Sequence, residues 1–392
     1  CALSAMAVHA SDAETAMMTL DLARQARHLA KDRQRPERTA ERAAVIAIAG
    51  AALAGKAGER LLALGLKRLD RALPQAVLAD GVHASRSPQA GLELLFDLLT
   101  LDDALSQRGR DAPVALSRAI DRLQGALRFF SLADGRLACF QGGETVCATR
   151  VAAALALDAS TTRPSDTAPN GGYQRLQGPT VQAMFDAGPA AGGVYADQAC
   201  AQALALEVVC GRDRLITNGG WSRESGAPEA LRLSDAASTV TLGDTSAGTP
   251  LSGWLAALLG PRLKGAPRRI DVRRHEAPEG VWLDLGHDAW ARRFGLRHAR
   301  RLFLDRANDQ LRGEEEKRAV VGDARGQPRG VQVHEREQRV RLGRTTVGGE
   351  RPEQRVDPEQ RATDDGSDEH ERRRNLDGLA NDAWCEEVGL DL

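Results

Sequence analysis

The sequence predicts a multidomain α+β protein, with helices in the first part of the chain and an antiparallel β-sandwich after them. Up to about residue 158, apolar residues recur every three or four positions, which is the spacing of helices that bury one face. Residues 159–171 are rich in Pro, Ser, Thr and Gly, a composition typical of a linker. Downstream, short runs of alternating apolar residues lie between Gly-containing turns, and this pattern indicates antiparallel strands.

The helical part is expected to consist of antiparallel hairpins. Amphipathic helices are predicted over Asp12–Leu29 and Leu61–Leu73. Between them, Ala43–Ala54 contains almost only Ala, Ile, Val and Leu, which predicts a buried helix whose small side chains permit close packing. Two more helices are predicted over Ala112–Phe130 and Val151–Asp158. Helices of this length that are joined by short loops, with no strand pattern between them, favour helical hairpins.

The stretch Leu78–Leu105 places a polar loop directly before a further helix. The loop contains His83 and Arg86, and it ends in Ser87 and Pro88, a good N-cap and a good first helical residue. Backbone N–H groups at a helix N-terminus lack partners and carry positive potential. The loop is therefore a candidate anion-binding site.

The second part of the chain is predicted to be all-β. Many short strands between Gly-rich turns favour an antiparallel sandwich. The predicted strands are Thr180–Asp186, Ala203–Cys210, Arg214–Thr217, Ser238–Leu242, Val281–Leu285 and Leu296–Leu304.

Composition excludes several classes of protein. The 53 basic and 54 acidic residues give a net charge of −1, so no global positive field marks a nucleic-acid partner. The six cysteines include no C-x-x-C pair, which argues against a zinc ribbon and against a disulfide framework. No stretch is long and apolar enough to predict a transmembrane segment.

Four segments carry a family resemblance. Asp80, Gly81, Ser87 and Pro88 match a D-G-x-x-x-E-x-S-P-x-Y loop. Three further motifs follow in the same order, G-Y-Q-R-L at Gly172–Leu176, S-T-V-T-L at Ser238–Leu242 and G-H-D-A-W-A-R-R-F-G at Gly286–Gly295. On these residues the chain resembles the heparinase II/III family of polysaccharide lyases over roughly residues 40 to 313.

The resemblance implies a domain order. Residues 1–158 would form part of an (α/α) toroid of helical hairpins, residues 159–171 a linker, and residues 172–313 a heparinase II/III-like β-sandwich domain. It also implies a periplasmic or secreted location. The compartment stays open, because the chain begins with Cys and shows no leader, and we expect that its true N-terminus is missing.

Residues 314–392 differ in composition from the rest of the chain. They are rich in Arg, Glu, Asp and Gly, and Trp384 is their one aromatic residue. Such a segment buries too little apolar surface to offset chain entropy. The composition predicts either a disordered, low-complexity tail or a shift of the reading frame near Glu314.

Lyase action by β-elimination needs a group that neutralises the uronate carboxylate, a base for the C5 proton and an acid for the leaving oxygen. By resemblance, the family's loop Glu falls at Ser85 and its catalytic Tyr at Ala90. Its neutralising Asn or His falls near Arg35–Arg38, where neither occurs, and a β-domain His falls at Cys200. The resemblance therefore implies a lyase whose activity is weakened or lost.

The family's structural metal would use positions that are Cys200, Asn218 and Ala237 in this chain. Too few strong ligands remain there for zinc, so we expect no metal. We expect no other cofactor.

His83 and Tyr195 are the candidate catalytic residues. His83 could contact a carboxylate or act as the base, and an ordinary solvent-exposed His is the alternative. Tyr195 is one of only two tyrosines and could take over the role of the missing Tyr.

Five residues are candidates for substrate binding: Arg86, Tyr173, Trp290, Arg292 and Arg293. Arginine binds a carboxylate or sulfate bidentately, and an aromatic ring flanked by cations suits an anionic sugar. The alternatives are a solvated surface charge for Arg86, a core position for Tyr173 and packing at a strand edge for Trp290.

Two functions remain open from the sequence. The first is a lyase that cleaves uronic-acid linkages of an anionic polysaccharide such as a glycosaminoglycan, and the second is a relative that binds such a glycan without cleaving it. A hydrolase would need two opposed carboxylates. Asp80, Glu93 and Asp97 are the nearby acids, and the sequence gives no sign that they face a cleft. The expected partner is an anionic polysaccharide, and the oligomeric state stays open.

Overall fold

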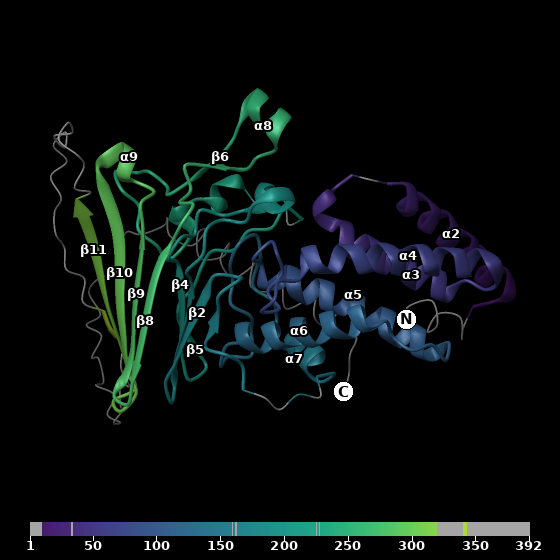
Figure 1. Ribbon diagram of the computed structural model, residues 1–392, viewed down its shortest axis with the longest axis horizontal. Helices are drawn as coiled ribbons and strands as arrows, with labels where there is room; N and C mark the ends of the chain where they lie inside the picture. Colours follow the sequence, from purple (N-terminus) through teal and green to yellow (C-terminus); the bar gives the residue numbers. More distant parts are fainter. Residues whose placement is uncertain are drawn as a thin grey trace, which may run out of the picture.

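The computed structural model describes residues 10–319 apart from 33, 159, 161, 162, 225 and 227, together with the backbone of 340–342. Helices make up the first part of this range (Figure 1). None of the helices in the described ranges is long and apolar enough to cross a membrane. The helices of this part are α2 (Asp12–Lys31), the single-turn η1 (Pro36–Arg38), α3 (Thr39–Ala52), α4 (Gly55–Ala76), α5 (Pro88–Gln107), α6 (Val114–Phe130) and α7 (Ala148–Leu155).

Helices α3 and α4 pack closely because small residues line their contact. A Cβ added at Gly65 would lie 2.4 Å from the backbone nitrogen of Ala47, and one at Gly50 would lie 2.2 Å from that of Leu62. Both distances are far below van der Waals contact, so the helices can approach this closely only where side chains are absent. The Ala-rich composition of Ala43–Ala54 predicts this close packing.

Two five-stranded antiparallel sheets follow the helices. The first has the order β1-β2-β3-β4-β5 and the second the order β12-β11-β10-β9-β8. The strands of the first are β1 (Thr167–Ala168), β2 (Tyr173–Gln177), β3 (Val181–Asp186), β4 (Leu206–Cys210) and β5 (Asp213–Ile216). Those of the second are β8 (Asp271–Ala277), β9 (Gly280–His287), β10 (Leu296–Asp305), β11 (Gln310–Ala319) and β12 (Val340–Leu342).

Short elements connect strands within the sheets and link the first sheet to the second. A small hairpin of two strands carries the helix α8 away from the body of the molecule (Figure 1). These elements are η2 (Gly193–Gln198), η3 (Glu229–Arg232), η4 (Ser234–Ala236), β6 (Thr249–Pro250), α8 (Gly253–Leu259), β7 (Leu263–Lys264) and α9 (Ala291–Phe294).

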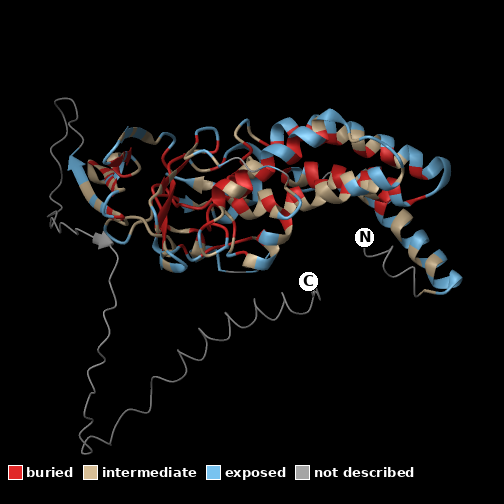
Figure 2. Ribbon diagram, turned by 90° about the horizontal axis from the view of Figure 1, so that it is seen from below, coloured by how far each residue is buried: buried red, intermediate tan, exposed pale blue. Residues whose placement is uncertain are grey.

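The first sheet is the middle layer of three, with the helices on one face and the second sheet on the other (Figure 1). One apolar cluster joins the helices to Tyr173, Met184 and Val209 of the first sheet. A second cluster joins the opposite face of this sheet to the second sheet, with Phe185 and Leu302 among its members. All six residues of β3 are therefore buried, and Figure 2 shows buried residues concentrated between the layers.

The strand predictions fail in two places. One predicted strand does not form, and one strand with many charged residues was not predicted. The predicted strand Ser238–Leu242 is wrong, because these residues form only an isolated bridge from Leu242 to Thr245. Strand β8 was not predicted, since it lies at the sheet edge and most of its side chains are exposed. Its charged residues therefore give no apolar alternation.

Strand β11 continues to Ala319, past the predicted boundary at residue 313. It is held by full pairing with β10, in which Glu315 lies opposite Arg300. Charged partners across the strands thus extend the sheet where apolar residues are scarce. Apart from this strand and the backbone of β12, the predicted disordered or frame-shifted tail, residues 314–392, lies outside the described residues.

Candidate functional site at the junction of the helices and the first sheet

His83 lies in the loop between α4 and α5, with its side chain almost completely buried. Its Nδ1 accepts a hydrogen bond from the backbone N–H of Ser85 (3.2 Å) and lies 2.7 Å from the Ser85 hydroxyl. That hydroxyl in turn accepts from the backbone N–H of Ser87 (3.2 Å), so its own proton points to Nδ1. The ring is therefore the neutral tautomer with its proton on Nε2, and Nε2 has no hydrogen-bond partner among the described residues.

The loop holds this position because of its sequence. Gly81 adopts φ +84°, and a Cβ there would lie 1.9 Å from the carbonyl oxygen of Arg122. Ser87 caps α5 as predicted, since its hydroxyl accepts from the backbone N–H of Ala90 (3.3 Å), and Pro88 is the first helical residue.

Tyr195 meets His83 although 112 positions separate them in the sequence. It lies on η2, and the two rings contact edge to face, with centroids 5.2 Å apart and planes at 76°. Burial, with the nearby carboxylates of Glu41 and Glu37, raises the pKa of Tyr195 to about 12. Its phenol therefore keeps its proton at neutral pH and can donate it. Burial, with the positive charge of Arg38, lowers the pKa of His83 to about 3, so the imidazole stays neutral.

Arg38 lies at the centre of the charged groups around this pair. Its guanidinium is 2.8 Å from Glu224 and 3.4 Å from Glu41. The Glu41 side chain is largely buried, one of its oxygens (Oε2) has no hydrogen-bond partner among the described residues, and burial raises its pKa. A buried carboxylate with raised pKa and an unused oxygen is a suitable general base.

Two acids of α5 belong to the same site. Burial, with the charges of Glu41 and Glu93, raises the pKa of Asp97 to about 7. Burial likewise raises the pKa of Glu93, which pairs with Arg150 at 2.5 Å. We call the whole group the Arg38 cluster, and its members are Arg38, Glu41, His83, Glu93, Asp97 and Tyr195.

Sequence reasoning missed Arg38 and Glu41, and it found no role for Glu93 and Asp97. One signal was present, because Glu93 and Asp97 are four residues apart within the apolar stretch of α5, which places both on one face of the helix. No local pattern predicts that η1 and η2 come together, since their contact depends on the tertiary fold.

Arg86 and Tyr173 are structural in this arrangement. The Arg86 side chain is buried, and its five N–H groups are directed at the carbonyl oxygens of Gly171, Gly172, Gly188 and Pro189 and at Asp186 (2.5 Å). Tyr173 is fully buried under the Arg86 guanidinium, and its hydroxyl donates to the Arg86 carbonyl oxygen (2.6 Å). The prediction that these two residues contact substrate is not supported, because neither has a donor left to offer.

Trp290, Arg292 and Arg293 are remote from the Arg38 cluster, since they lie at α9 on the second sheet, across the first sheet from the helices (Figure 1). Trp290 is 1% exposed and packs against His287 and His298. A ring with no exposed face cannot stack on a sugar, so the predicted platform is not supported. Arg292 and Arg293 are exposed and remain able to contact an anion.

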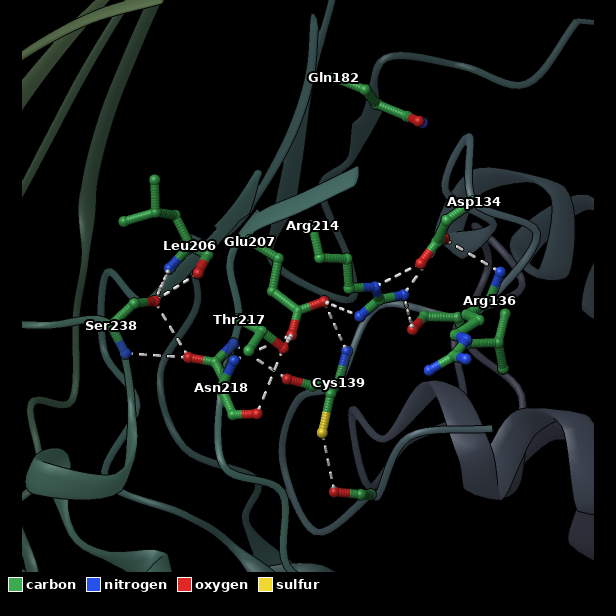
Figure 3. Close-up of polar contacts among 12 residues, drawn as sticks. Asp134, Arg136, Cys139, Gln182, Leu206, Glu207, Arg214, Thr217, Asn218 and Ser238 are labelled. Atoms are coloured by element: carbon green, nitrogen blue, oxygen red, sulfur yellow. Dashed lines mark hydrogen bonds and ion pairs between the residues drawn. The ribbon is translucent and has the colours of Figure 1, made fainter. Parts of the chain in front are cut away.

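The region expected by resemblance to hold a metal contains a buried polar network instead (Figure 3). Glu207 lies at its centre and is completely buried. Its Oε2 accepts from the backbone N–H of Cys139 (3.0 Å) and from Arg214 (3.1 Å). Its Oε1 accepts from the hydroxyl of Thr217 (2.9 Å) and the backbone N–H of Asn218 (3.0 Å). Protein donors thus use the oxygen ligands that a cation would need.

Cys200 is buried nearby, and burial raises the pKa of its thiol to about 12. A protonated thiol is a poor metal ligand and a poor nucleophile. In the part of the chain that the structure describes, no three His, Cys, Asp or Glu side chains are grouped so that they could hold a metal ion.

The chain is similar in sequence to a known family and to a known protein. A family model described as "Heparinase II/III-like, C-terminal" matches residues 160–369, more than half of the chain. The FtsZ-localized protein C of Caulobacter vibrioides (strain NA1000 / CB15N) is 52% identical over 341 residues. That match covers 85% of this chain and 59% of the relative, so the chain spans less than two thirds of the relative's length.

Solved structures resemble the fold at low sequence identity. A heparan sulfate lyase mutant from Pedobacter heparinus matches with a TM-score of 0.54 and 14% identity, over 76% of this chain and 48% of that one. A heparinase III matches with a TM-score of 0.53 and 12% identity, over 71% of this chain and 46% of the other. At these identities the likeness shows the fold alone, and the chain spans about half the length of either protein.

Proposed function

This chain belongs to the heparinase II/III family, and from this premise we propose that the Arg38 cluster binds an anionic, uronate-containing polysaccharide and cleaves it slowly by β-elimination. One observation carries the proposal. The buried Nε2–H of His83 has no hydrogen-bond partner among the described residues, and it lies beside a phenol that keeps its proton. An unpaired buried donor is costly unless a ligand completes it.

The groups of the cluster divide the reaction between them. Arg38 and the neutral Nε2–H of His83 would bind the uronate carboxylate, which makes the C5 proton more acidic. Glu41 would remove that proton through its unpaired oxygen, and the electron pair would form the C4=C5 double bond as the C4–O bond breaks. The Tyr195 hydroxyl would give its proton to the leaving oxygen.

His83 thus has a different role from that of a base. Its Nδ1 is occupied by Ser85, and the pKa of the ring is about 3, so it is a weak proton acceptor at neutral pH. A neutral imidazole that donates from Nε2 can instead hold an anionic oxygen through one hydrogen bond.

Slow turnover is expected because the family's own groups are absent. Ala90 stands at the position of the family's catalytic Tyr by resemblance, and Cys200 at that of a His. Loss of one proton-transfer group typically costs about 10²–10⁴ in rate. Glu41 and Tyr195 would restore only part of the lost rate, since other charged groups already surround both side chains.

We also propose that α2–α7 form part of the family's (α/α) toroid and that the two sheets are the core of its β-sandwich. The antiparallel hairpins, the face-to-face apolar cluster of the sheets and the partial length of the match support both assignments. The whole protein's activity and substrates remain part of the proposal.

The test is turnover on a panel of uronate polymers, followed by ultraviolet absorbance. Elimination creates a conjugated double bond that absorbs, whereas hydrolysis and binding do not. We expect slow absorbance growth that His83→Ala, Glu41→Gln and Tyr195→Phe each reduce. His28→Ala, at an exposed His on α2, is the matched control and should leave the rate unchanged. Turnover that none of the three variants reduces would place the reaction elsewhere.

A second candidate function is binding without cleavage. The relative that is 52% identical is named for localisation with FtsZ and not for a reaction. In this case the cluster would recognise the glycan, and the chain itself would localise with FtsZ. No absorbance change on any polymer, together with co-sedimentation of the chain with FtsZ polymers, would favour this function over the lyase.

A further inference from the structure

Helix α8 is apolar along its whole length, and yet none of its residues is buried. Its sequence, G-W-L-A-A-L-L, contains no charged residue. Trp254 is 73% exposed, and Leu258, one helical turn further on, is 71% exposed. A helix that is apolar on all sides normally lies in a protein core or in a membrane. The exposure of α8 therefore indicates that a partner covers it.

The helix lies at the end of a short hairpin. Strand β6 leads into α8 and strand β7 leads out of it, and the two strands pair with each other. We call β6, α8 and β7, residues 249–264, the α8 hairpin. It stands out from the body of the molecule, so that α8 lies beyond the sheets and the other helices (Figure 1). Its apolar side chains can thus reach a partner before the rest of the fold does.

The base of the α8 hairpin is bonded to the fold. Arg232 of η3 is completely buried, and its guanidinium donates to the carbonyl oxygens of Pro261 (2.8 Å) and Ala199 (2.9 Å). The same guanidinium pairs with Glu229 at 2.6 Å, which neutralises its charge. The apolar tip is therefore held at a defined place on the molecule.

The segment that contains the hairpin is basic. Residues 245–270 include four basic residues and no acidic one. All four follow the helix in the chain, and all four side chains are exposed. They are Arg262, Lys264, Arg268 and Arg269. The helix thus supplies apolar surface, and the chain that leaves it supplies positive charge.

Neighbouring carboxylates offset only part of this charge. Arg269 pairs with Asp271 at 3.2 Å. Asp197 of η2 lies beside Gly260, at the end of α8, and offsets one further positive charge. The other three basic side chains of the segment form no ion pair within the described residues. An excess of positive charge therefore remains next to the apolar tip.

A lipid surface with anionic headgroups matches both features. Interfacial helices bury their apolar side chains about 5–10 Å into the boundary between headgroups and acyl chains. Trp is enriched at this level, and Lys and Arg close to it are attracted by anionic headgroups. Arg262 and Lys264 come three and five residues after Leu259, so both lie near the inserted tip. A second copy of the chain would instead bring like charges together.

We propose that the α8 hairpin, with the basic residues up to Arg269, docks the protein on an anionic lipid surface. A helix of this length measures about 10 Å, whereas the hydrocarbon core of a bilayer is about 30 Å thick. Helix α8 therefore lies in the interface and does not cross it. The docking does not depend on the Arg38 cluster or on its reaction.

The test is co-sedimentation of the full chain with lipid vesicles at several salt concentrations. The vesicles contain phosphatidylcholine alone or phosphatidylcholine with phosphatidylglycerol. We expect binding to the second kind that weakens as salt rises. Trp254→Ala with Leu258→Ala should weaken it by about tenfold or more at every salt concentration. Arg262→Gln with Lys264→Gln should weaken it by about tenfold at low salt and make the salt dependence shallower.

Two double substitutions on α2 are the matched controls, and both should leave binding unchanged. Met17→Ala with Leu20→Ala removes exposed apolar side chains, and Arg24→Gln with Arg27→Gln removes exposed charges. Because all the substituted side chains are exposed, the melting temperatures should match that of the unsubstituted chain.

Three outcomes would overturn the inference. The first is that the unsubstituted chain binds neither kind of vesicle. The second is binding that the hairpin substitutions weaken no more than the controls on α2 do. The third is an oligomer in solution that Trp254→Ala with Leu258→Ala dissociates while vesicle binding is unchanged, which would show that α8 joins copies of the chain.

Discussion

Arg86 shows how much of the fold can depend on one side chain. It bonds the loop before α5 to the two turns that flank the first sheet, and it pairs with the fully buried Asp186. Removal of one partner of a buried ion pair leaves an uncompensated charge, which costs about 3–5 kcal/mol.

We therefore expect that Arg86→Ala lowers the free energy of unfolding by at least about 3 kcal/mol, measured by urea denaturation. Arg86→Lys should also be strongly destabilising, because an ammonium group cannot reach five separate acceptors. Arg24→Ala, at an exposed arginine, is the control and should change the stability by less than about 0.5 kcal/mol. A loss below about 1 kcal/mol for Arg86→Ala would mean that these bonds are not made in solution.

His83 is expected to make stability depend on pH. Its pKa is about 3 in the folded chain because the ring is buried, whereas an unfolded His titrates near pH 6.5. Below about pH 6.5 the unfolded chain binds a proton that the folded chain does not. The stability that neutral His83 contributes is thus complete above that pH and is lost as the pH falls towards 3.

The measurement is the difference in unfolding free energy between the unsubstituted chain and His83→Gln across pH. Above about pH 7 the difference should be constant, and below about pH 6 it should change by up to about 1.4 kcal/mol per pH unit, to the disadvantage of the unsubstituted chain. The variant retains all other titrating groups, including Asp97, so their contributions cancel. Parallel curves over the whole range would show that the ring is solvated.

Among the helices, the contact of α3 with α4 gives a sharp expectation. A Cβ at Gly65 would lie 2.4 Å from the Ala47 backbone nitrogen, which cannot move without shifting the helix. Gly65→Ala should therefore lower the melting temperature, with a loss of about 1–3 kcal/mol in the free energy of unfolding from overpacking.

Gly125→Ala in α6 is the control, since the nearest atom to its Cβ would be 3.9 Å away. Alanine also favours a helix over glycine, so this control should be neutral or slightly stabilising. Equal melting temperatures for the two variants would contradict the close packing.

Most of the helices could be predicted from the sequence because each of them buries a single face that the apolar spacing records, and α3, which is buried on most of its surface, was predicted from its run of small apolar residues. The strands were predicted less well, since two different surroundings obscure their pattern. Strand β3 is buried on both faces, whereas β8 and β11 expose charged residues at or near a sheet edge. The candidate site was predicted only in part. His83 could be found from its loop, but its contact with Tyr195 and Glu41 depends on how η1, η2 and the loop meet.

Across the molecule, residues 159–171 separate two parts that differ in sequence pattern, but the two parts share one apolar core. The core of the helices includes Tyr173, Met184 and Val209 from the first sheet. A chain cut within the linker would expose both sides of this shared core, which costs roughly 25 cal/mol for each Å² of apolar surface.

We therefore expect that neither residues 10–158 nor residues 160–392 unfold cooperatively as separate chains, and that the full chain shows one transition. Circular dichroism on heating, for the two fragments and the full chain, provides the measurement. Two separate cooperative transitions in the full chain, each reproduced by one fragment, would show that the layers are independent.

The complete burial of β3 also limits how this protein can change during evolution. Successive residues of β3 face the helices and the second sheet in turn. Each residue therefore packs in one of two apolar cores, and a substitution on either face would disturb that core. In β8 and β11 most outward residues are exposed or only partly buried, and their contacts are surface ion pairs such as Arg318 with Glu316, so they can be replaced singly. New binding properties can therefore arise on the outermost strands while the middle sheet is preserved, and the molecule can acquire new ligands without altering the layer that holds it together.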